Sequence, residues 1–89
     1  MERWLAIGRV KHWEDATVFK ADMKPTANWR IDPRSTVTEV LLLDDGRIVA
    51  ECATPDRAAF EQWLAKHGCE IESLTKVVQV ARTGEVWKA

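Results

Sequence analysis

Residues 36–54 constrain the fold more than any other stretch, because they have the pattern of a β-hairpin. Two apolar, β-branched runs flank Asp44-Asp45-Gly46 in the segment TVTEVLLLDDGRIVAECAT. An Asp-Gly pair between such runs is the strongest short-range hairpin signal, because glycine has no Cβ and accepts a positive φ. The rest of the chain is then interpreted by asking what packs against this hairpin.

Two registers are compatible with the turn. A two-residue loop at Asp45-Gly46 would place Leu43 opposite Ile48 and would scatter charge over both faces. A three-residue loop, with Gly46 in the left-handed position, leaves one face uniformly apolar or small. We favour the three-residue loop because a helix can bury that face. The cross-strand pairs then expected are Leu42 with Ile48, Val40 with Ala50, Thr38 with Cys52, and Glu39 with Glu51.

The second face of the hairpin, under this register, presents Leu41, Leu43 and Val49 away from the helices. An uncovered apolar cluster on a small domain usually marks a contact surface. We therefore expect these three residues to form an interface, either in a homodimer that pairs sheet to sheet or with another protein partner.

Length and composition limit the class of protein. A chain of 89 residues indicates a single domain, residues 1–89. Its apolar fraction of 46% is sufficient for a core, and a net charge of −1 argues against a basic nucleic-acid surface. The first residues, MERWLAIGRVKHW, contain only a short apolar segment, which Arg9 and Lys11 interrupt. We therefore expect neither a signal peptide nor a membrane span here. We expect a soluble, cytoplasmic protein that binds neither nucleic acid nor membrane.

The other elements follow from periodicity and from helix start and stop signals. Residues 3–13 alternate as a strand, and residues 24–35 have the composition of a connecting loop. Residues 14–24 fit a short helix capped by Asp15 and fit a strand almost as well; we favour the helix. Thr54-Pro55-Asp56 predicts the start of a second helix, which Gly68 ends. Residues 74–81 predict a strand, and residues 85–87 can add a short one after the turn at Thr83-Gly84.

The resulting order is strand, helix, strand, strand, helix, strand. This order, with its Asp-Gly hairpin, Pro-started helix and Val-rich strand, resembles the small ferredoxin-like families, including those that pair as dimeric α/β barrels. The resemblance implies an α+β fold of the βαββαβ type, with an antiparallel sheet, both helices on one face, and room for a short extra C-terminal strand. The resemblance is based on the order of the secondary-structure elements and not on a diagnostic motif.

Five tryptophans and no tyrosine form an unusual aromatic set. Most of them are expected to supply core volume in a short chain. Because tryptophan is also enriched at binding hot spots, Trp13 and Trp29 are the candidates for a ligand-binding pocket.

Cysteine and histidine define the remaining candidate chemistry. Cys52 and Cys69 are expected to be free thiols, since the predicted second helix separates them too far for a disulfide. His12, His67 and Cys69 should lie at one end of the sheet, where they could bind a zinc- or nickel-type metal. His67 is equally explained as a residue at a helix C-terminus. We expect no cofactor other than this metal.

No nucleophile or phosphate-loop motif assigns a catalytic residue, and Glu39 facing Glu51 is the only paired carboxylate. The sequence therefore favours a non-enzymatic module that binds a protein partner or small ligand through its sheet face, as a homodimer. The alternative is a small enzyme or metal-binding protein of the dimeric α/β-barrel type, with its site between sheet and helices.

Overall fold

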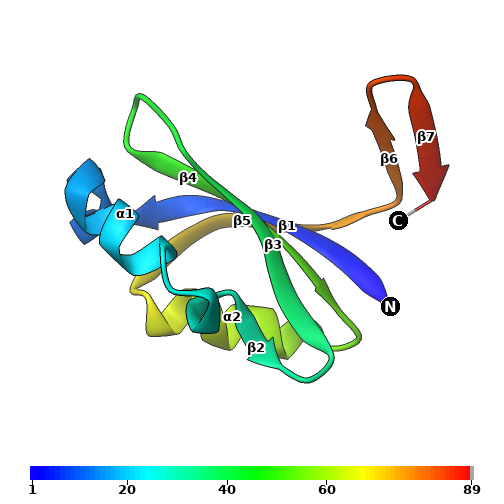
Figure 1. Ribbon diagram of the computed structural model, residues 1–89, viewed down its shortest axis with the longest axis horizontal. Coiled ribbons are helices and arrows are strands. Elements are labelled where there is room, and N and C mark those ends of the chain that lie inside the picture. The colour runs from blue at the N-terminus through cyan, green and yellow to red at the C-terminus, as the bar shows by residue number, and fades with distance from the viewer. Residues whose placement is uncertain (89) are drawn as a thin grey trace.

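A five-stranded antiparallel sheet, in the order β2-β3-β4-β1-β5, is the centre of the computed structural model, which describes residues 1–88 (Figure 1). A second sheet contains only β6 and β7. The strands are β1 (Glu2–Val10), β2 (Arg30–Asp32), β3 (Ser35–Leu42), β4 (Arg47–Thr54), β5 (Cys69–Val77), β6 (Gln79–Arg82) and β7 (Glu85–Lys88). The helices are α1 (Ala16–Met23) and α2 (Arg57–Lys66), with 3-10 turns η1 (Lys11–Glu14) and η2 (Thr26–Asn28).

The α+β class is confirmed, but the simple ferredoxin-like βαββαβ arrangement is wrong. The described chain has seven strands, with an additional edge strand β2 beside β3 and a separate β6–β7 hairpin. Only α2 packs against the sheet, whereas α1 lies beside η1 and η2 at the end of the sheet (Figure 1). The predicted strand 74–81 is interrupted at Val78, where the chain leaves the main sheet.

The central hairpin has the expected three-residue register for most of its length. Leu42 pairs with Ile48 and Val40 with Ala50, around a turn in which Gly46 has a φ of 88°. The predicted pairing of Thr38 with Cys52 is wrong. A register shift places Val37 opposite Cys52, because Val37 is the side chain that the core buries, and the Thr38 hydroxyl instead donates to Glu51 Oε1 at 2.9 Å.

The helical alternative for residues 14–24 is confirmed. α1 begins at Ala16, and the Asp15 carboxylate caps it by accepting the backbone N–H of Thr17 at 2.9 Å. A single 3-10 turn, η1, precedes the helix, so β1 ends at Val10 rather than at residue 13.

The second predicted helix is also present, with a different cap from the one expected. Asp56, not Thr54, caps α2 by accepting the N–H of Ala58 at 3.0 Å. Thr54 is the buried end of β4, and its hydroxyl hydrogen-bonds the Ser35 hydroxyl at 2.7 Å. This bond joins the ends of β3 and β4 below the helix start.

The core lies between α2 and the sheet and continues under α1. Trp13 is fully buried and is packed against Phe19, Trp63 and His67, with ring centroids 5.1–6.4 Å apart. Aromatic pairs at such distances stabilise a core beyond their buried area. The buried apolar residues are Ala6, Val10, Trp13, Met23, Val37, Ile48, Ala50, Cys52, Phe60, Trp63 and Leu64.

Candidate functional site

The sheet has one face covered by α2 and one face without a helix over it in the part of the chain that is described (Figure 1). We call the second one the open face. Because side chains alternate along each strand, the odd positions of β1 and β4 share it with the odd positions of β3 that follow the register shift between Val37 and Glu39. The apolar side chains of the open face are Leu5, Ile7, Leu41 and Val49. The open face thus includes Leu41 and Val49 of the residues predicted for an interface, whereas Leu43 lies just past the end of β3, where its backbone N–H donates to the Arg47 carbonyl at 2.8 Å.

A hollow of about 160 Å³ lies on the open face. It is lined by Leu5, Glu39, Leu41, Val49 and Glu51. Leu41 is 47% exposed. Sequence reasoning missed Leu5 because its place here depends on the pairing of β1 with β4, in which Leu5 stands opposite the sequence-distant Glu51.

Of the two carboxylates that line this hollow, Glu51 is paired within the chain and Glu39 has no ion pair among residues 1–88. The Arg3 guanidinium lies 2.9 Å from Glu51 Oε1, and the Arg82 guanidinium approaches the same oxygen at 4.0 Å. Glu39 does stand opposite Glu51, as expected. However, the two carboxylates lie on an open surface and one of them has a cationic partner, which is the ordinary setting of solvated surface carboxylates.

The β6–β7 hairpin rises from the sheet on the side opposite α2 (Figure 1). Its strands pair only with each other in the described residues, and Arg82 is its contact with Glu51 on the open face. Val78, just before β6, is 71% exposed, and Val86 on β7 is 70% exposed. The sequence signal for this hairpin was the turn at Thr83-Gly84, followed after Glu85 by the apolar pair Val86-Trp87.

The two tryptophans considered for a ligand pocket have structural roles. Trp13 is fully buried, and its indole N–H donates to Asp22 Oδ2 at 2.7 Å. Trp29 is half-buried, and its indole N–H donates to the Met23 carbonyl at 2.6 Å. Trp29 also borders a shallow, open hollow beside η2 and β2. The structure does not bring Trp13 and Trp29 to one pocket.

The candidate metal ligands are not arranged around a common point. His12 Nε2 is 3.5 Å from Asp22 Oδ2, whereas the His67 ring meets Trp63 edge-on, with centroids 4.5 Å apart and an interplanar angle of 61°. Within residues 1–88, no group of three or more His, Cys, Asp or Glu side chains could hold a metal ion. The geometry therefore adds nothing in favour of the metal hypothesis.

Both cysteines are free thiols. Burial raises the pKa of Cys52 to about 12, with a smaller contribution from Asp32. Burial also raises the pKa of Cys69. Because the thiolate is the nucleophile, a raised pKa makes a thiol less reactive at physiological pH.

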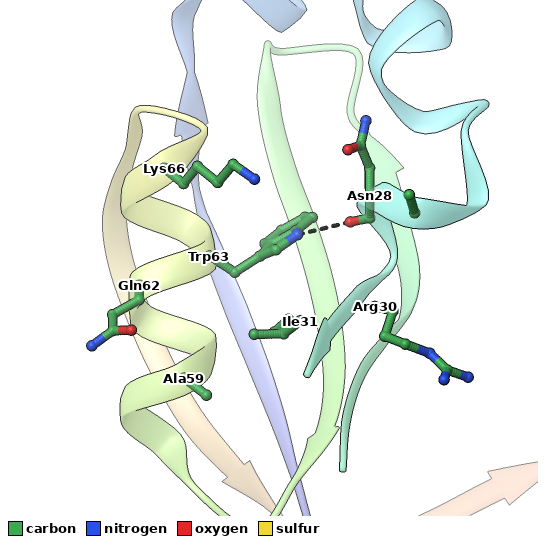
Figure 2. A pocket seen from close by; sticks show the side chains of 8 residues that line it. Asn28, Arg30, Ile31, Ala59, Gln62, Trp63 and Lys66 are labelled. Carbon is green, nitrogen blue, oxygen red and sulfur yellow. Dashed lines mark hydrogen bonds between the residues drawn. The ribbon is translucent and has the colours of Figure 1, made fainter. Parts of the chain in front are cut away.

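A second hollow, of about 200 Å³, lies between α2 and the segment that joins η2 to β2 (Figure 2). The Trp63 indole N–H donates to the Asn28 carbonyl at 2.8 Å across it. Sequence reasoning placed Trp63 in the core and missed this role, because the contact spans 35 residues.

Comparisons with protein-family models, with curated proteins and with solved structures each found no match. Of the described helices, none is long and apolar enough to cross a membrane. The fold and its surface define a small α+β domain with one helix-covered and one open sheet face.

Proposed function

We propose that this protein is a small interaction module that pairs with a second copy of itself through the open face. The observation on which the proposal rests is the apolar hollow at Leu5, Leu41 and Val49, which no element of residues 1–88 covers. Interfaces of homodimers have apolar centres and polar rims, and the open face has this arrangement.

The ion pairs of the open face favour a second copy as the partner. Arg3 pairs with Glu51, Arg47 with Asp45 at 2.8 Å, and Arg9 lies 3.9 Å from Glu72. Because these charges are paired within the chain, Glu39 is the one charged residue lining the hollow that lacks an ion pair among residues 1–88 when two identical faces meet. A two-fold interface needs this kind of self-complementary patch.

The β6–β7 hairpin gives a second reason for a partner. An isolated two-stranded hairpin is at best marginally stable in water. Here the hairpin leaves two valines and Trp87, which is 37% exposed, without cover from the main domain. Since the hairpin projects on the side of the open face, a second copy docked there would also bury these side chains.

The test is the oligomeric state by sedimentation velocity over micromolar concentrations. We expect a dimer in the wild type, and we expect Leu41→Glu to weaken it by a factor on the order of 100, because it buries an unpaired carboxylate. The matched control is Ile71→Glu on β5. Ile71 is similarly exposed, at 41%, but it pairs with Gly8 and so faces the α2 side.

A wild-type monomer at high micromolar concentration would overturn the homodimer. Equal dissociation by Leu41→Glu and Ile71→Glu would place the interface elsewhere than on the open face.

A further inference from the structure

We propose that the hollow between α2 and β2, which we call the α2–β2 pocket, is a binding site for a small organic anion with an apolar body, such as an aromatic carboxylate. The site lies on the α2 side of the sheet and is independent of the open face.

The floor of the pocket is apolar. Ala27 and Ile31 border it from the η2–β2 side, and Ala59 and Trp63 border it from α2 (Figure 2). Its volume of about 200 Å³ is below the roughly 300–1,000 Å³ of pockets for drug-sized ligands. The pocket therefore fits a ligand of about one ring.

The walls are fixed before any ligand arrives. The Trp63 indole N–H donates a hydrogen bond to the Asn28 backbone carbonyl at 2.8 Å. The Asn28 side-chain amide donates a hydrogen bond to the Asp22 backbone carbonyl at 2.6 Å. These two bonds connect α2 to η2 and η2 to the end of α1. A preformed pocket avoids the entropy loss of ordering its own side chains on binding.

The charge of the pocket is positive. Its charged lining residues are Lys66 and Arg30, and no carboxylate lines it. Neither cation has a carboxylate within ion-pair distance among residues 1–88. The Lys66 ammonium extends from α2 toward Asn28, whereas the Arg30 guanidinium points outward (Figure 2). The whole chain has a net charge of −1, so the positive charge is specific to this pocket.

An apolar floor with a cation at its mouth selects a ligand with both an apolar body and an acidic group. Apolar contact with the floor, made by Ala27, Ile31, Ala59 and the edge of the 6% exposed Trp63, provides most of the affinity. The ion pair with Lys66 fixes the orientation. Inorganic phosphate can form only the ion pair with Lys66, and a neutral aromatic amide can make only the apolar contact with the floor.

The experiment is a titration followed by amide and indole N–H NMR shifts, with benzoate, benzamide and inorganic phosphate as probes. We expect benzoate to bind with a Kd on the order of 1 mM and to shift residues of η2, β2 and α2, including the Trp63 indole. Benzamide and phosphate should bind more weakly. Lys66→Gln should weaken benzoate binding roughly two- to fivefold, the range of an exposed ion pair.

Two further variants complete the design. Lys20→Gln removes an exposed lysine of α1 outside the pocket and should leave the benzoate titration unchanged. Ala59→Met should abolish binding by filling the hollow, with the fold retained because Ala59 is partly exposed and methionine favours helices.

The proposal is overturned if benzoate shifts no resonance of the pocket, or if Ala59→Met leaves the shifts intact. Equal binding of benzoate and phosphate would refute the apolar requirement, and equal effects of Lys66→Gln and Lys20→Gln would refute the role of Lys66. Each outcome is separate from the oligomeric state.

Discussion

Gly8 is the residue that lets β1 and β5 approach each other closely. It lies opposite a register shift in β5, and a Cβ built there would come within 2.3 Å of the Glu70 carbonyl oxygen and 2.8 Å of Cys69 Sγ. We predict that Gly8→Ala lowers the free energy of unfolding by about 3 kcal/mol, the upper end of an overpacking penalty, because backbone must move. Urea denaturation measures this change.

The control for this substitution is Gly68→Ala. Gly68 has a φ of 74°, but its Cβ would meet nothing within 4 Å. It should therefore show only the conformational penalty of a left-handed alanine, about 1 kcal/mol. If both substitutions destabilise the protein equally, crowding at Gly8 is not the cause.

The β6–β7 hairpin is the element whose order depends most on a partner. Four cross-strand pairs join β6 to β7, and no other strand supports them in the structure. We predict that hydrogen exchange in the hairpin is about tenfold faster in Leu41→Glu than in the wild-type dimer, the factor for about 1.4 kcal/mol of lost burial.

Exchange in the pair β1–β4 is the internal control, and its amides should be equally protected in both proteins after correction for global stability. If the hairpin exchanges at the same rate in the dimer and in Leu41→Glu, then dimer formation does not cover it, whatever the oligomeric state.

Elements with strong local signals could be predicted from the sequence. The Asp-Gly turn determined the hairpin, and Gly68 correctly ended α2. β2 was missed because its three residues lie just before Pro33, in a stretch whose Pro and Asn content is typical of a loop, and only pairing with β3 makes it a strand. The cap of α2 was misplaced by two residues because Thr54 and Asp56 are both good capping residues, and the burial of Thr54 decides between them.

At the scale of the whole molecule, the features that could not be predicted from the sequence are those that depend on long-range contacts. Alternation from a known turn was enough to put Leu41 and Val49 on one face. The contribution of Leu5 to the same hollow needed the pairing of β1 with β4. The α2–β2 pocket needed the contact of Trp63 with Asn28, which no local pattern in the sequence indicates.

The pH dependence of global stability should depend on His67, which connects α2 to the aromatic core. Its ring packs against Trp13 and Trp63. Burial lowers the pKa of His67 below the ordinary 6.5. The nearby Asp22 raises this pKa, whereas Lys66 and His12 add smaller lowering effects.

Below pH 6.5 the unfolded chain therefore binds more protons at His67 than the folded chain does. The free energy of unfolding must then fall as the pH falls from 6.5 toward the native pKa, and His67 contributes no slope above 6.5. We predict that His67→Gln flattens the stability profile below pH 6.5, measured by urea denaturation, and that the His67 ring titrates below 6.5 by NMR. A ring midpoint above 6.5, or an unchanged slope in His67→Gln, would contradict the prediction.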